Sequence, residues 1–135
     1  MANVIYENYR QALLDGSVNT DMSGGTVKVA LVDTGTYTYS AAHTFLSDLS
    51  GVVGTAVTLG TKTFTDGSFD SANPTWTAVT GATVEAVVIY IDTGVAGTSR
   101  LVAYIDTGQT NLPVTPNGGN ISFTVDAAGW FQLGG

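Results

Sequence analysis

The stretch of sequence that decides the fold is IYIDTGVAGTSRLVAYIDTG, residues 89–108. It contains two apolar runs, each ending in Asp-Thr-Gly, on either side of a short segment with two glycines. Two such runs joined by turn-forming residues predict a β-hairpin that turns through residues 93–99. The first run, residues 83–92, is apolar almost throughout, which is typical of a central strand buried on both faces.

The Asp-Thr-Gly triplet occurs three times, at Asp33, Asp92 and Asp106. Aspartic proteases carry this triplet at their catalytic carboxylates, so a catalytic role was the first hypothesis to test. The hairpin places Asp92 opposite Arg100 and Asp106 near Ala86, which separates the two carboxylates by roughly 20 Å at about 3.3 Å per residue. Carboxylates that far apart do not share a proton or a water molecule as a protease pair does.

A homodimeric protease with one Asp33 from each chain is also disfavoured. Thr36 follows the first triplet where retroviral proteases carry alanine, and their later hydrophobic-hydrophobic-Gly-Arg element does not occur in this sequence. The triplets instead predict strand ends, where an Asp or Thr side chain accepts backbone hydrogen bonds and glycine supplies a positive φ. The sequence therefore predicts no catalytic residues and a protein that is not an enzyme.

A short helix at the N-terminus is the one element predicted with helical periodicity. Apolar residues recur at helical spacing from Ile5 to Leu13, Asn3 is a suitable N-cap, and Gly16 is suitable to end the helix. We predict a helix over residues 3–15, and a short helical turn within residues 37–54.

The remainder of the chain predicts strands and loops, with a β core over residues 26–133. Gly60 is a candidate β-bulge within a long, threonine-rich strand. Taken together, the pattern predicts a mainly β protein: one domain over residues 1–135, an antiparallel β-sandwich or partly closed barrel with a short N-terminal helix. The strands are expected at residues 26–33, 55–65, 74–79, 83–92, 100–106, 120–126 and 129–133.

Composition limits the possible partners. The chain has 4 Lys and Arg against 11 Asp and Glu, a net charge of -7, so no basic surface is available to neutralise nucleic-acid phosphates. No apolar run is long enough to span a membrane, and the N-terminal residues do not have the pattern of a signal peptide. We expect no direct nucleic-acid binding and no membrane association. Charged residues make up only 11% of the chain, which suits a surface buried in an assembly.

Metal and cofactor sites are not predicted. The chain contains no cysteine, and His43 is its only histidine, so it has no second ligand of these types for a metal site or a nucleophilic dyad. We expect His43 to be an ordinary loop residue. Asp66 and Asp70 are spaced as possible calcium ligands, but the Asp-x-Asp-x-Asp-Gly loop with its distant glutamate does not occur.

Several motifs together resemble a group of small virion proteins from tailed bacteriophages. They are KVALVD from residue 28, FLSD from residue 45, GSFDSANPTW from residue 67, the two DTG runs of the opening stretch, and PVTPNGG from residue 113. The likeness spans nearly the whole chain. Because these motifs reflect strand and turn spacing, they carry no catalytic signature.

The resemblance implies a non-enzymatic capsid decoration or cement protein that binds the major capsid protein on the outside of the shell. It also implies a homo-oligomer, assembled in the host cytoplasm and located in the virion. Two alternatives stay open: a tail or head-tail structural protein, and a carbohydrate-binding fibre module in which Trp76 or Tyr39 stacks on a sugar ring.

Aromatic side chains are the usual anchors of protein interfaces. The sequence offers six candidates, each of which could equally well pack in the core. These are Tyr6, Tyr9, Tyr37, Tyr39, Trp130 and Phe131.

Overall fold

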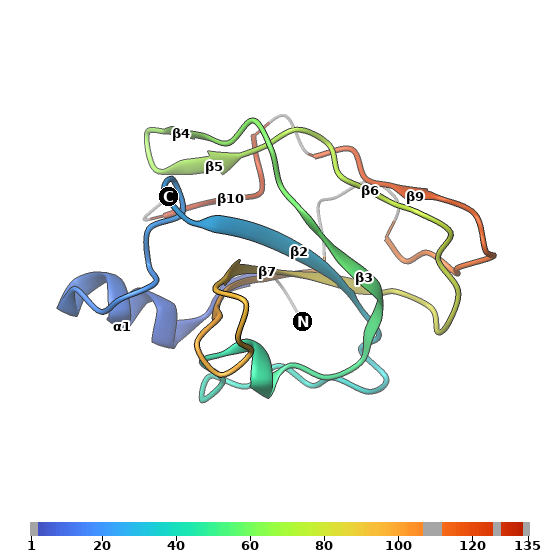
Figure 1. Ribbon diagram of the computed structural model, residues 1–135, viewed down its shortest axis with the longest axis horizontal. Coiled ribbons are helices and arrows are strands. Elements are labelled where there is room, and N and C mark those ends of the chain that lie inside the picture. The colour runs from blue at the N-terminus through green and yellow to red at the C-terminus, as the bar shows by residue number, and fades with distance from the viewer. Residues whose placement is uncertain (1–2, 107–111, 126–127, 134–135) are drawn as a thin grey trace.

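The computed structural model describes residues 3–106, 112–125 and 128–133, and its main element is a five-stranded antiparallel sheet (Figure 1). The strand order is β1-β8-β7-β2-β3. In this order the strands are β1 (Val4–Ile5), β8 (Arg100–Ile105), β7 (Ala86–Asp92), β2 (Thr26–Val32) and β3 (Val52–Thr58).

A second layer of short strands covers one face of this sheet (Figure 1). It consists of a three-stranded sheet in the order β10-β5-β4 and a pair formed by β6 and β9. These strands are β10 (Phe131–Gln132), β5 (Ser68–Asp70), β4 (Thr63–Thr65), β6 (Thr75–Trp76) and β9 (Ile121–Ser122). The mainly β, sandwich-like arrangement is therefore as predicted. Within the described ranges β1 and β3 do not pair with each other, so the large sheet is open and not a barrel.

The central hairpin has the predicted register to within one residue. Ile91 pairs with Arg100 at the turn end, and Val87 pairs with Ile105 at the other end. Strand β7 is the third of five, and six of its seven residues are buried. A register shift follows Ile89, which adds twist to the hairpin without exposing its apolar residues. The prediction of a central strand buried on both faces is confirmed.

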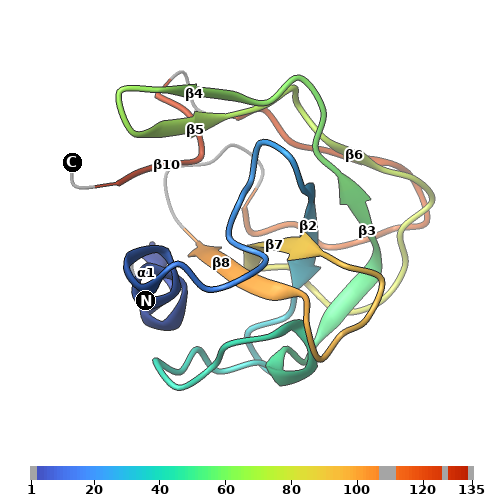
Figure 2. The same ribbon diagram turned by 60° about the vertical axis from the view of Figure 1, so that its left-hand side comes forward.

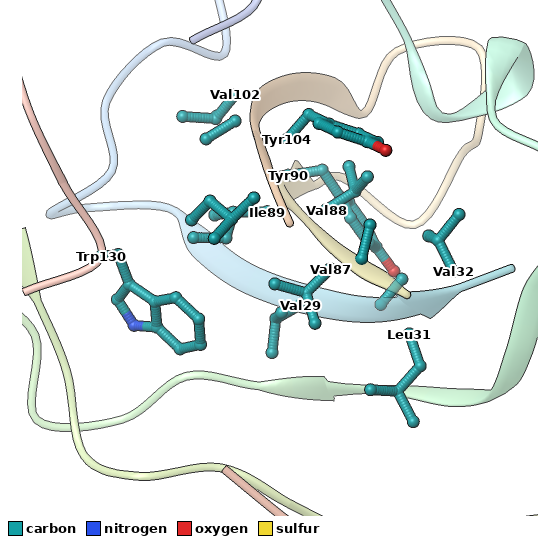
Figure 3. Packing of buried hydrophobic residues seen from close by; sticks show 14 of the residues in the cluster. Val29, Leu31, Val32, Val87, Val88, Ile89, Tyr90, Val102, Tyr104 and Trp130 are labelled. Atoms are coloured by element: carbon teal, nitrogen blue, oxygen red, sulfur yellow. The ribbon is translucent and has the colours of Figure 1, made fainter. Parts of the chain in front are cut away.

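Aromatic side chains from the second layer fill the space between the two layers. Trp130 is 2% exposed and stacks on Phe123 with ring centroids 6.1 Å apart, and Phe123 meets the ring of Trp76 edge-on at 5.8 Å. Figure 3 shows Val29 and Leu31 on the same side of β2 as Trp130. The short strands of the second layer form few backbone pairs, so the packing of these large rings stabilises the layer instead.

The N-terminal helix α1 is shorter than predicted and covers Glu7–Asp15. The residues before it form the edge strand β1, because pairing with β8 satisfies their backbone groups. Asn3 does not cap the helix; its Oδ1 accepts a hydrogen bond from the Asp106 amide at 2.8 Å. Gly16 does end the helix, with a left-handed φ of 72°. No helix in the described ranges is long and apolar enough to cross a membrane.

The predicted strand over residues 55–65 is in fact two strands, β3 and β4. The chain leaves the large sheet after Thr58 and enters the small sheet at Thr63, so the two strands lie in different layers. The register shift lies opposite Val29 to Leu31, where Gly54 has a φ of 70°, and Gly60 is not at a bulge. Strand β5 was not predicted. The expected helical turn is a short 3₁₀ helix over Leu46–Asp48.

Two further predicted strands are much shorter than expected. Of residues 74–79 only Thr75–Trp76 form a strand, and Ala78, two residues later, has a φ of 50°, which interrupts the extended conformation. Of the strand predicted over residues 120–126, the structure describes residues 120–125, and within these only Ile121–Ser122 form a strand.

Candidate functional site

An apolar groove of about 470 Å³ opens at one end of the sandwich, between the small sheet and the segment that contains α1. In Figure 2, α1 lies below the β4–β5 hairpin and β10, and the chain that leads from it to β2 rises toward that hairpin. We call this feature the phenylalanine groove. Its apolar wall residues are Tyr9, Leu13, Met22, Phe64, Phe69, Phe131 and Leu133.

One wall of the groove is a row of three phenylalanines across the small sheet. Phe69 on β5 is the register partner of both Phe64 on β4 and Phe131 on β10, so the three side chains share one face of the sheet. The ring centroids of neighbouring pairs are 5.4 and 5.5 Å apart. The central ring of Phe69 is buried, while that of Phe64 is 47% exposed at the sheet edge.

The other wall is held in place by hydrogen bonds. The Tyr9 hydroxyl donates to the Thr20 carbonyl at 2.9 Å, and burial raises the pKa of this phenol to about 12. The Lys62 ammonium donates to the carbonyls of Met22 and Gly25, each at 2.7 Å. Because Lys62 lies just before β4, these bonds connect the loop to the small sheet. Strand pairing therefore holds one wall of the groove in place, and these hydrogen bonds hold the other.

The groove exposes large apolar side chains to solvent. Leu13 is 39% exposed and Leu133 is 41% exposed, and both stand at its margin near Phe64. Exposed apolar side chains that converge on one hollow are typical of surfaces that bind a partner. Such a surface offers desolvation energy and shape to a partner.

The structure places four of the six aromatic candidates in the core. Their side chains are no more than 3% exposed, so they present almost no surface to a partner and follow the core-packing alternative. These are Tyr6, Tyr9, Tyr37 and Trp130. Tyr39 and Phe131 are half-buried, and of these two only Phe131 lines the groove. Trp76 is 1% exposed and buried beneath the surface, so its ring is not available to stack on a sugar.

The sequence contained a signal for the groove that the predictions above did not use. Residues 63–69 read TFTDGSF, in which Asp66-Gly67 separates two short alternating runs. Asp-Gly between such runs is a strong signal for a two-residue hairpin. Asp66 and Gly67 have φ values of 52° and 80°, as that turn requires, and the turn brings Phe64 and Phe69 into register.

The aspartates considered for metal binding have structural roles. Asp66 lies in the hairpin turn, and the Asp70 carboxylate accepts a hydrogen bond from the Ser71 amide at 2.7 Å. Among the residues that the structure describes, no three His, Cys, Asp or Glu side chains are grouped as metal ligands.

The Asp-Thr-Gly triplets end strands. Asp92 accepts hydrogen bonds from the Gly94 amide at 3.2 Å and the Ser99 hydroxyl, and its other carboxylate oxygen lies 3.2 Å from the Lys28 ammonium. The Gly94 amide, followed by Lys28, holds the pKa of Asp92 below its usual value. Gly94 has the expected positive φ of 87°.

The other two triplets differ in detail. The Asp33 carboxylate accepts from the Gly35 amide at 2.9 Å, but Gly35 does not have a positive φ. The chain there turns in a helical manner, because the amides of Thr36 and Tyr37 both donate to the Asp33 carbonyl. The glycine of the third triplet, Gly108, lies outside the described residues.

The half-buried His43 lies at the end of a chain of hydrogen-bonded side chains that begins at the buried Tyr6. The Tyr6 and Tyr37 hydroxyl oxygens are 2.7 Å apart, and the Tyr37 hydroxyl is also 2.7 Å from Nδ1 of His43. This network fixes the irregular segment that contains His43 against the large sheet. The histidine thus has a structural role that the sequence did not indicate.

No family model matches this sequence, and no curated protein matches it either.

Proposed function

We propose that this protein is a structural, non-enzymatic component of a tailed-phage virion. More specifically, we propose a capsid decoration or cement protein that binds the major capsid protein on the outside of the shell. The observation that carries the proposal is the phenylalanine groove, a braced apolar surface with Phe64, Leu13 and Leu133 exposed at its margin. The resemblance of the strand and turn motifs to small virion proteins supports the major capsid protein as the partner.

The groove supports a binding role because of what partner binding would remove from water. Phe64 is about half exposed, and burying an aromatic ring of this kind contributes on the order of 1–2 kcal/mol per side chain. Leu13 and Leu133 add further apolar surface beside it. A rigid groove loses little conformational entropy on binding, so more of this energy remains as affinity.

The proposed mechanism is thermodynamic. A protein that binds only the mature capsid lattice stabilises that lattice by its own binding free energy at every occupied site. If the protein acts as a homo-oligomer, its copies bind neighbouring capsid subunits together and gain avidity. The low content of charged residues, 11%, is compatible with a surface that becomes buried between proteins.

The test uses purified protein and capsids that lack it. We expect wild-type protein to co-sediment with these capsids and to raise the temperature at which the shells release their contents. Phe64→Glu places a charge in the groove and should weaken capsid binding about 30-fold, the loss of about 2 kcal/mol typical of an interface anchor. Val95→Glu is the matched control, because Val95 is 60% exposed in the β7–β8 loop and does not line the groove.

The outcomes separate the two parts of the proposal. If wild-type protein does not bind the capsids, the decoration role is contradicted. If it binds and Phe64→Glu binds equally well, with both proteins folded by circular dichroism, the groove is not the binding surface. The alternative of a tail or head-tail component uses the same fold, and particle density for this chain in the tail alone would establish it over the decoration role.

A further inference from the structure

A second hollow, of about 450 Å³, lies at the end of the large sheet where β7 begins. We call it the tyrosine pocket. Its chemistry differs from that of the phenylalanine groove, because tyrosine rings, threonine hydroxyls and carboxylates line it together. The residues that matter below are Thr34, Tyr37, Tyr39, Glu85, Tyr104 and Asp106.

Three tyrosines form the aromatic part of the pocket. The ring centroids of Tyr39 and Tyr104 are 5.8 Å apart, and those of Tyr37 and Tyr104 are 6.3 Å apart. Tyr37 and Tyr104 are almost fully buried and form the floor, while Tyr39 is half-buried and stands at the side. The hydroxyl network of Tyr37 with Tyr6 and His43 holds this floor rigid.

Two carboxylates converge on the same pocket because of the strand register. Glu85 immediately precedes β7 and Asp106 immediately follows β8, and the pairing of Val87 with Ile105 brings these two strand ends together. Oε1 of Glu85 accepts hydrogen bonds from the amide and the hydroxyl of Thr34, at 3.0 and 3.3 Å. These bonds hold the Glu85 side chain at the pocket.

The negative charges of the pocket affect the pKa of Tyr104 in its floor. Burial raises the pKa of the Tyr104 phenol, and the nearby charge of Asp106, with smaller effects of Tyr37 and Glu85, raises it further. The pocket therefore combines aromatic rings with a negative potential. No lysine or arginine is among its lining residues.

The chain's own four cationic side chains are held elsewhere. Lys28 pairs with Asp92 at 3.2 Å, and Arg10 lies 3.9 Å from Glu7 on the exposed face of α1. Lys62 and Arg100 donate to backbone carbonyls of residues 18–25. None of the four lines the tyrosine pocket, and Arg10 acts on its side only through its charge near Tyr39.

We propose that the tyrosine pocket binds an arginine side chain of a partner protein. A guanidinium group is planar, stacks on aromatic rings and donates several hydrogen bonds in one plane to carboxylates. Tyr39, the half-buried tyrosine at the side of the pocket, supplies the ring for stacking, and Glu85 and Asp106 supply the acceptors. The charge of the pocket, in a protein of net charge -7, favours a basic segment over an acidic or neutral one.

This inference stands apart from the proposed virion function. It concerns a different surface and a partner defined only by its arginine. If the partner is the major capsid protein, the two surfaces provide an apolar contact and a charged contact with the same shell, and only the charged one is strongly weakened by salt.

The test is titration of the ¹⁵N-labelled protein with N-acetyl-argininamide, followed by NMR. The matched probe is N-acetyl-citrullinamide, which has the same shape without the charge, and N-acetyl-lysinamide carries the charge without the planar group. We expect chemical-shift changes for Tyr39, Glu85 and Tyr104 with the arginine probe. The citrulline probe should bind about tenfold more weakly or worse, because charge-assisted hydrogen bonds are about twice as strong as neutral ones.

Variants test the two carboxylates. Glu85→Gln keeps an oxygen to accept from Thr34, and Asp106→Asn keeps the side-chain shape, so both should fold. Each should weaken arginine binding severalfold, and the double variant should abolish it. Asp92→Asn, at the opposite end of β7, should bind the probe as the wild type does.

Four results would overturn the proposal. The first is equal binding of the arginine and citrulline probes, and the second is tighter binding of the lysine probe than of the arginine probe. The third is a set of shift changes in the pocket produced by a neutral oligosaccharide and not by the arginine probe, which would make the tyrosine pocket a sugar site. Absence of any shift change at Tyr39 and Tyr104 with the arginine probe would also reject it.

Discussion

The two sheets of the sandwich have different relations to solvent. In the large sheet, β7 and β8 are buried along nearly their whole length, with residues such as Ile89 and Leu101 fully covered. In the small sheet, β4 exposes all three of its residues, and only Phe69 of the phenylalanine row is buried. Burial in the large sheet therefore supplies most of the free energy that stabilises the fold, while the small sheet exposes apolar side chains to solvent.

The largest effect on stability is expected in the large sheet. Ile89→Ala removes three buried carbon atoms from the central strand, where the side chain is 0% exposed, and leaves a cavity. We expect the free energy of unfolding to fall by about 3–4 kcal/mol, measured by urea denaturation. Val95→Ala, in the exposed β7–β8 loop, should change it by less than about 0.5 kcal/mol. Similar losses in the two variants would remove the distinction between core and surface.

A smaller effect is expected in the small sheet, just before β10. Gly129 has a φ of 93°, and a Cβ atom there would lie 2.5 Å from the Phe69 carbonyl oxygen. We expect Gly129→Ala to reduce the free energy of unfolding by about 2 kcal/mol, because the backbone must move to relieve both strains. Gly97→Ala is the matched control, since nothing lies within 4 Å of its Cβ position.

The position of Gly129 makes this a test of the small sheet itself. The Trp130 amide donates to the same Phe69 carbonyl at 2.7 Å, so a shift there separates β10 from β5. Chemical shifts of Phe64 and Phe131 should change in Gly129→Ala while those of β7 stay the same. Changes that spread equally through β7 would show that the two sheets do not behave as separate regions.

The smallest effect is expected at the turn of the central hairpin. Asp92→Asn keeps the shape of the side chain but removes the charge that faces Lys28 at 3.2 Å, so we expect a loss of about 1 kcal/mol at neutral pH. The folded state lowers the pKa of Asp92, so the charge stabilises the protein above the unfolded-state pKa of about 4. That stability disappears as the pH falls through the folded-state pKa.

The measurement is urea denaturation of both proteins at several pH values. The difference between wild type and Asp92→Asn should be constant near neutral pH and should shrink steadily below about pH 4. A difference that grew on acidification would contradict the role assigned to the Asp92 carboxylate. High salt should reduce the difference as well, because the ion pair is partly exposed.

The central hairpin of the large sheet could be predicted from sequence because its signal is local. The continuous apolar run of β7 and the following turn determine a hairpin whichever other elements surround it, and Arg100 pairs with Ile91, one residue from the predicted Asp92. The helix end at Gly16 was predictable for the same reason. The start of the helix was not, since residues 4–5 join a sheet whose partner strand β8 lies about a hundred residues away in the chain.

The candidate sites were harder to predict because they depend on contacts between distant segments. The phenylalanine groove needs Leu13, Phe64 and Phe131 from three parts of the chain, and the buried aromatic residues looked equally suitable in the sequence. Only the Asp66-Gly67 turn gave a local signal for it. The tyrosine pocket needs the register of β7 and β8 to bring Glu85 to Asp106. Neither arrangement appears in any one stretch of sequence.

The order in which the groove walls occur along the chain has a consequence for synthesis on the ribosome. Its walls come from residues 9–23, 64–69 and 131–133, so the hollow does not exist until the chain has been made as far as Leu133. Strand β1 likewise waits for β8 before it pairs. A nascent chain that has not yet reached Leu133 therefore lacks the apolar docking surface, and partner binding through this surface begins only after these residues have folded together.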